Sequence, residues 1–184
     1  MVQSPLQVSA DFIDYPYFSD LGLVQNAAVL LQAGFDVSVL NAFAQQDSGL
    51  WELPGENELL LGCPMDVFFE QFERLAEGVE AVVFHLSPFH RPPQRDISLG
   101  RLLQRAKQLG KLTVLADLYQ AGQHYIEVSE ADLRRHYPEA DHWVQYEAEA
   151  ALPSSLKKLL RGDALPWHQR GQGVEELDAL PLPA

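Results

Sequence analysis

The sequence has little positive charge, a single cysteine and no long apolar run. Thirteen lysine and arginine residues stand against 26 aspartate and glutamate residues, which gives a formal charge of −13 over 184 residues. So acidic a surface repels nucleic-acid backbones and anionic lipid, so binding to nucleic acids or membrane surfaces is not expected. The lone Cys63 excludes an internal disulfide and is typical of a reducing compartment. Without an apolar stretch of about twenty residues or a signal peptide, the sequence predicts a cytoplasmic protein.

Several motifs that recur in α/β proteins are also missing. Neither G-x-G-x-x-G nor G-x-x-x-x-G-K-[ST] occurs, so dinucleotides and nucleoside triphosphates lack their usual phosphate-binding loop. The nucleophile elbow G-x-S-x-G is absent, and the six histidines and one cysteine show no metal-ligand spacing. A phospho-receiver would need an aspartate after its third strand and a lysine after its fifth, where Ser87 and Tyr146 stand instead. The sequence therefore identifies no catalytic residue and no metal ligand.

What the sequence does contain is an alternation of apolar strands and amphipathic helices. We expect strands at 8–13, 35–40, 81–86, 112–116 and 141–146, and helices at 21–33, 64–76, 99–109, 129–137 and 149–160. This order predicts a doubly wound α/β fold, with a mainly parallel five-stranded sheet in the flavodoxin-like order 2-1-3-4-5 and helices on both faces.

Two segments do not fit this alternation. Residues 44–63 show little periodicity and are expected to form a long loop, with Trp51 packed against the body of the domain. Residues 162–184 are rich in glycine, proline and acid, and are expected to form a tail or linker after a domain of residues 1–161.

Ligands of such sheets bind beyond the carboxyl ends of the strands, so the loops after strands one, three, four and five are the expected site. Their aromatic residues and prolines suit a broad, partly apolar ligand better than a compact anion. Alternatively, the aromatic residues close the end of the core or contact a partner domain. The loop residues concerned are Tyr15, Pro16, Tyr17, Phe18, Ser87, Phe89, His90, Tyr119, Gly122, His124, Glu147 and Glu149.

Short segments spread from Asp14 to Ala184 also share motifs with a known family. They are a proline-containing loop with a Leu-Gly-Leu helix start (14–23), a turn into strand two (33–37), a serine-bearing third loop (87–89), a glycine turn after strand four (121–122), two pieces near a G-E-G-E turn (137–141 and 146–149) and a proline-containing linker (177–184). Taken together, they resemble the amino-terminal cobalamin-binding domain of radical S-adenosylmethionine enzymes.

The resemblance implies a Rossmann-like domain with cobalamin lying across the strand ends. The cofactor contacts that it implies are Tyr15, Pro16, Tyr17, Leu21, Gly22, Ser87, Pro88, Phe89, Gly122, His124, Glu147 and Glu149. The iron–sulfur cluster and S-adenosylmethionine of the family belong to a radical barrel, whose C-x-x-x-C-x-x-C motif this chain lacks. We therefore expect a non-catalytic part of a cobalamin-dependent, methyltransferase-like enzyme, whose partner is a radical barrel in the same or another chain.

A few positions depart from the family pattern. Tyr146 and Ala148 replace the glycines of the G-E-G-E turn, and Ala121 replaces the first glycine of a Gly-Gly turn. A side chain there is costly only if φ is positive or if the ligand touches the backbone. No D-x-H-x-x-G occurs, so histidine ligation of cobalt is not expected. The alternatives are a degenerate scaffold or substrate-docking domain that binds no cofactor, and a nucleotide or flavin binder, which would lack its phosphate loop.

Overall fold

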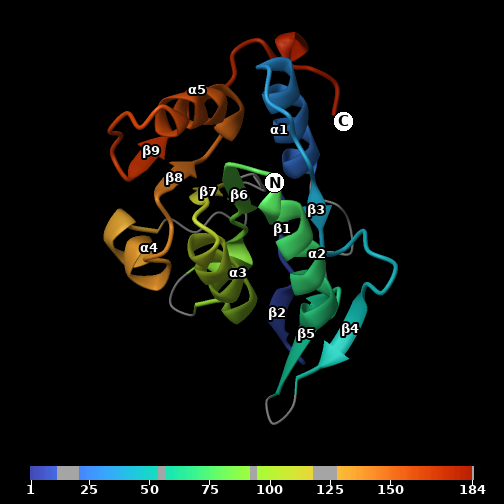
Figure 1. Ribbon diagram of the computed structural model, residues 1–184. Coiled ribbons are helices and arrows are strands. Elements are labelled where there is room, and N and C mark those ends of the chain that lie inside the picture. The colour runs from blue at the N-terminus through green and yellow to red at the C-terminus, as the bar shows by residue number, and fades with distance from the viewer. Residues whose placement is uncertain (12–20, 54–56, 92–94, 118–127, 184) are drawn as a thin grey trace.

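A six-stranded parallel sheet forms the centre of the protein (Figure 1). The structure is a computed structural model that describes residues 1–11, 21–53, 57–91, 95–117 and 128–183. Across the sheet, the strands are β3 (Leu40–Asn41), β1 (Val2–Gln3), β6 (Ala81–His85), β7 (Leu112–Ala116), β8 (His142–Gln145) and β9 (His168–Arg170), and all neighbours are parallel. The predicted α/β fold with a mainly parallel sheet is confirmed, but the sheet has six strands rather than five.

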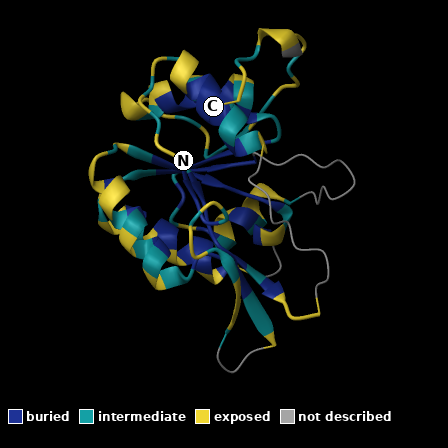
Figure 2. Cartoon of the chain, turned by 90° about the vertical axis from the view of Figure 1, so that its right-hand side faces the viewer, coloured by how far each residue is buried: buried dark blue, intermediate teal, exposed yellow. Residues whose placement is uncertain are grey.

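Helices cover both faces of this sheet. One face is covered by α1 (Leu21–Gln32) and α5 (Ala148–Leu160). The opposite face is covered by α2 (Met65–Glu77), α3 (Ile97–Gln108) and α4 (Glu130–His136). Residues of β6 alternate between the two cores, with Val83 beside Leu30 and Leu156 on the first face and Phe84 beside Phe72 on the second. Figure 2 shows the buried strands between two helix layers whose outer surfaces are exposed.

A second, antiparallel sheet was not predicted. It contains β2 (Leu6–Ser9), β5 (Glu58–Gly62) and β4 (Gly49–Glu52), in the order β2-β5-β4. The expected first parallel strand at 8–13 is wrong, because the chain leaves the parallel sheet after Gln3 and its next apolar residues pair with β5. The expected loop at 44–63 is also wrong, since it holds β4 and β5. Trp51 stabilises this hairpin through a 3.0 Å hydrogen bond from its indole nitrogen to the Gly62 carbonyl oxygen.

Residues 162–184, expected to be a tail or linker, contain β9 and a short 3-10 helix, η3 (Leu177–Ala179). β9 pairs with β8, and Trp167 packs on Trp143 with ring centres 6.0 Å apart. Further along, the carbonyl oxygen of Pro181 accepts a 2.9 Å hydrogen bond from the Gln25 side chain on α1. The described part of this segment therefore contacts the rest of the domain at β8 and at α1.

Candidate functional site

Buried polar residues gather where the parallel strands end. Gln3 and Ser4 lie at the end of β1, His85 and Ser87 at the end of β6, and Asp117 after β7, all with exposed fractions of 6% or less. Together with residues 146–149 after β8, they form the carboxyl edge of the sheet. α1 and α3 come later in the chain than the neighbouring strands β1 and β6 and lie on opposite faces of the sheet, and in such sheets ligands bind beyond the carboxyl ends of these two strands.

Ser87 and His90 form a hydrogen-bonded turn after β6, around the 3-10 helix η1 (Pro88–His90). The Ser87 amide donates to His90 Nδ1 at 3.0 Å, and the Ser87 hydroxyl lies 3.1 Å from the same nitrogen. Burial lowers the pKa of His90 well below its ordinary value, so the ring is neutral and its proton lies on Nε2, 3.2 Å from the Ser4 hydroxyl. The Ser87 hydroxyl, an expected cofactor contact, is therefore hydrogen-bonded within the protein.

A buried ion pair fixes the next part of the edge. Arg91 Nη2 lies 2.9 Å from Asp117 Oδ2, and both side chains are 1% exposed. Asp117 also accepts hydrogen bonds from the Trp143 indole at 3.3 Å and from the Tyr146 amide at 3.2 Å. Burial raises the pKa of Asp117, while Arg91 and these two donors oppose the rise. Asp117 therefore joins the loop after β6 to β7 and β8, a role that the sequence did not reveal.

The turn after β8 has an unusual backbone. Tyr146 has a φ of 63°, in the left-handed region that favours glycine, and the guanidinium of Arg170 lies 4.1 Å from the centre of its ring. Glu147 Oε2 accepts a 2.5 Å hydrogen bond from the Val174 amide. A Cβ atom on Gly171 would overlap the Glu147 carbonyl oxygen. The turn is thus held tightly against the segment that follows β9.

Gln3 and Asn26 carry buried oxygens on the α1 and α5 side of the edge. Gln3 Oε1 and Asn26 Oδ1 have no hydrogen-bond partner among the described residues. Asn26 Nδ2 donates to the Gly22 carbonyl oxygen at 3.0 Å, and the Asn26 side chain also contacts Glu149. Burial raises the pKa of Glu149, and the charge of Glu147 adds to the rise, while hydrogen bonds to its own backbone and to Asn26 oppose it. Because a buried unpaired oxygen costs about 1–3 kcal/mol, a ligand with N–H donors would stabilise this cluster.

The remaining predicted contacts differ in their placement. Leu21 is 68% exposed at the start of α1, and Phe89 is 39% exposed in η1 beside the partly buried Pro88. Five of the predicted cofactor contacts lie outside the described ranges, namely Tyr15, Pro16, Tyr17, Gly122 and His124, as do the predicted loop residues Phe18 and Tyr119. The predicted contacts that the structure brings to the carboxyl edge are Gly22, Ser87, Pro88, Glu147 and Glu149.

Comparison with known proteins gives no match: no protein family, curated protein or solved structure matches this chain. Among the described residues, no three or more histidine, cysteine, aspartate or glutamate side chains are grouped so that they could hold a metal ion. Within the same ranges, no helix has both the length and the apolar character to cross a membrane. A function for the chain is therefore inferred from the chemistry of the carboxyl edge.

Proposed function

We propose that this chain is a cobalamin-binding-like domain of a radical S-adenosylmethionine enzyme. The observation that carries the proposal is the φ of 63° at Tyr146, in the turn after β8. Tyr146 stands where the family has the first glycine of its G-E-G-E turn, and glycine is the residue that adopts positive φ without strain. Tyr146 keeps this conformation although it costs about 1–2 kcal/mol for a residue with a side chain. This supports the proposal that the turn has the backbone geometry of the family's G-E-G-E turn.

The topology offers further support. Counted in chain order, the parallel strands are arranged 2-1-3-4-5-6 across the sheet, and this order supports the proposal of a flavodoxin-like arrangement. In such a fold the ligand would lie where β1 and β6 end, beside Gln3 and Ser87. Cytoplasmic localisation and a radical barrel with its own iron–sulfur cluster and S-adenosylmethionine, in the same or another chain, belong to this proposal.

The unpaired oxygens fit the outer groups of a corrin ring. Corrin carries amide side chains whose N–H groups donate hydrogen bonds, and Gln3 Oε1 and Asn26 Oδ1 are buried acceptors without a described partner. Gln3 and Asn26 would therefore hold the ring by its amides. Bound cobalamin would supply a carrier for a methyl group.

Titration with hydroxocobalamin tests this function. The full chain should change the visible spectrum of the cofactor and retain it during gel filtration. Gln3→Met removes one buried acceptor at nearly constant volume and should weaken binding by about fivefold or more. Gln104→Met, on the exposed side of α3, is the matched control and should bind as the unmodified chain does.

A scaffold or substrate-docking domain without cofactor is the second candidate. It is favoured by the internal hydrogen bonds of Ser87, Asp117 and Glu147, which leave fewer polar groups for a ligand. The same titration separates the two functions. If hydroxocobalamin shows no spectral change and no retention even with a radical barrel protein added, the cobalamin proposal fails and the scaffold stands.

A further inference from the structure

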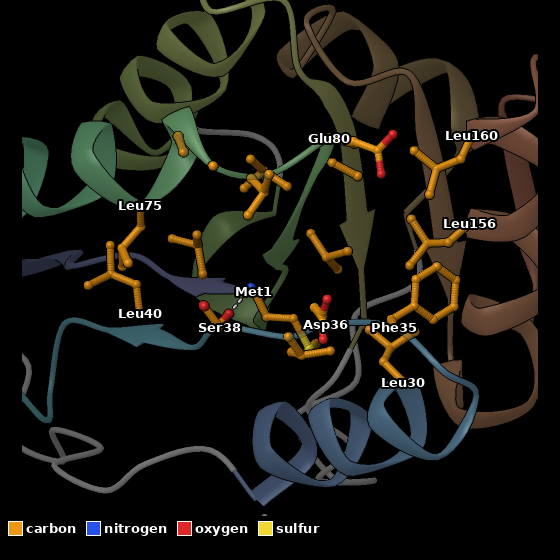
Figure 3. A pocket seen from close by; sticks show the side chains of 18 of the residues that line it. Met1, Leu30, Phe35, Asp36, Ser38, Leu40, Leu75, Glu80, Leu156 and Leu160 are labelled. Carbon is orange, nitrogen blue, oxygen red and sulfur yellow. Dashed lines mark hydrogen bonds between the residues drawn. The ribbon is translucent and has the colours of Figure 1, made fainter.

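A pocket of about 520 Å³ lies at the opposite end of the parallel sheet, where β1 and β6 begin (Figure 3). The carboxyl-terminal ends of α1, α2 and α5 surround it, so both helix layers contribute to its walls. Figure 3 shows Phe35, Leu156 and Leu160 on one side of this amino-edge pocket, and Leu40 and Leu75 on the other. The pocket shares no lining residue with the carboxyl edge, and its function is independent of the one proposed there.

Most of the residues that line the pocket are apolar, both in its interior and at its rim. Leu30, Val83 and Leu156 are buried, whereas Leu75 and Leu160 are 38% and 39% exposed. Leucine side chains from two different helices thus stay partly open to solvent beside the same cavity. Exposed apolar surface that continues into a cavity is typical of ligand-binding sites.

The polar groups at the rim disfavour an anion. The carboxylates of Asp36 and Glu80 are exposed and line the pocket. The Ser38 carbonyl oxygen, also at the rim, accepts a 2.6 Å hydrogen bond from the Met1 nitrogen. Lys157 Nζ lies 5.8 Å from the centre of the Phe35 ring, but Lys157 does not line the pocket.

We infer that the amino-edge pocket binds an apolar small molecule that is neutral or cationic. Its volume lies within the roughly 300–1,000 Å³ of pockets that hold small organic ligands, which accommodates a molecule of about three aromatic rings. Burial of the rings against the leucines supplies the affinity. The two carboxylates reject negatively charged molecules of the same shape.

Two fluorescent probes with the same aromatic body test this inference on the full chain. N-phenyl-1-naphthylamine is uncharged, and 8-anilino-1-naphthalenesulfonate adds a sulfonate. The uncharged probe should bind at a single saturable site, at least about tenfold more tightly than the sulfonate. Asp36→Asn with Glu80→Gln should reduce this difference, whereas Glu77→Gln, an exposed glutamate outside the pocket, should leave it unchanged.

Rim variants locate the bound probe. Leu75→Glu with Leu160→Glu places charge on both sides of the pocket and should lower the affinity for N-phenyl-1-naphthylamine at least about tenfold. Leu31→Glu is the matched control, because Leu31 is 47% exposed on α1 and does not line the pocket. Gly78→Phe is a second variant intended to narrow the pocket, because Gly78 lines it and a Cβ atom there meets no atom within 4 Å. Failure of the uncharged probe to bind, equal losses in the Leu31 variant, or unchanged affinity in both pocket variants would overturn the inference.

Discussion

The two ends of the parallel sheet are built from opposite kinds of side chain. At the carboxyl edge, ionisable and amide groups are buried, and most of them bind one another, as Arg91 binds Asp117. At the amino edge, Leu75 and Leu160 are partly exposed around a cavity, and the carboxylates of Asp36 and Glu80 face solvent. The carboxyl edge is ordered by polar contacts that are lost when one partner is removed. We expect the amino edge to tolerate changes to its charged groups, because they are exposed.

Breaking the buried ion pair should give the largest effect. Arg91→Met leaves the Asp117 carboxylate buried without its main counter-charge, so we expect the free energy of unfolding to fall by about 3–5 kcal/mol. Urea unfolding at pH 7 measures the loss. Lys107→Met is the control, because the Lys107–Asp141 pair is 40% and 33% exposed and contributes about 1 kcal/mol or less. Adding Asp117→Asn to Arg91→Met should restore part of the lost stability. Similar losses in the Arg91 and Lys107 variants would show that the buried ion pair is no more important than the exposed one.

The contribution of acidic side chains to the pH dependence of stability should also differ between the two edges. Asp96 caps α3 beside the carboxyl edge, where it accepts hydrogen bonds from the Leu99 amide at 2.7 Å and the Gln7 amide at 3.2 Å. Burial raises the pKa of Asp96 to about 6, against the opposing effect of these amides. The folded state then holds this proton more tightly than the unfolded chain. Asp96 therefore favours folding most at low pH, and this contribution falls as pH rises from about 4 to about 6.

Asp96→Asn removes this titration. The free energy of unfolding of the unmodified chain, minus that of the variant, should decrease by about 3 kcal/mol between pH 4 and pH 7. Urea unfolding at a series of pH values measures this difference. Asp36→Asn, at the exposed rim of the amino-edge pocket, should change stability by no more than about 0.5 kcal/mol at any pH. A difference for Asp96→Asn that stays constant with pH would show that its carboxylate is not desolvated.

An added side-chain atom should destabilise the carboxyl edge more than the amino edge. Gly171→Ala places a Cβ atom against the Glu147 carbonyl oxygen, so we expect a loss of about 1–3 kcal/mol or displacement of the segment after β9. Gly78, at the amino-edge pocket, has a φ of −86°, and a Cβ atom added there meets no atom within 4 Å. The free energy of unfolding of Gly78→Ala should therefore stay within about 0.5 kcal/mol of that of the unmodified chain. Thermal unfolding and limited proteolysis measure both effects. Equal midpoints with unchanged cleavage after Arg170 would refute the tight packing of the carboxyl edge.

The sequence predicted the elements whose residues carry their own signal. The strands at 81–86 and 112–116 were predicted because their residues are continuously apolar, and both form in the parallel sheet. Gly34 and Gly110 follow α1 and α3 with φ of 88° and 71°, a conformation that glycine adopts readily after a helix. β9 was missed because its three residues, His-Gln-Arg, are polar and it joins only the edge of the sheet.

The carboxyl edge was predicted only in part, because its contacts join distant residues. Its location follows from the strand ends, and Ser87 and Glu147 were identified on that basis. The pairing of Arg91 with Asp117 joins residues 26 positions apart and depends on where the turn after β6 places Arg91. Internal hydrogen bonds of Ser87 could not be foreseen either, because His90 becomes its partner only through the local turn. The sequence thus predicted where the site lies, whereas tertiary packing determines which polar groups at the carboxyl edge have no hydrogen-bond partner.

The smallest effect should come from the strained turn at Tyr146. Tyr146→Gly and Tyr146→Ala both remove the ring that Arg170 covers, so the lost contact is the same in the two variants. Alanine keeps a Cβ atom at a φ of 63°, whereas glycine adopts this conformation freely, so Tyr146→Gly should be more stable than Tyr146→Ala by about 1 kcal/mol. Gly78 lies at the amino edge, where φ is negative, so Gly78→Ala should show no such penalty. Urea unfolding of the two Tyr146 variants measures the backbone strain without the ring contact. If alanine proves as stable as glycine, the turn is not strained, and the retained geometry that supports the cobalamin proposal is lost.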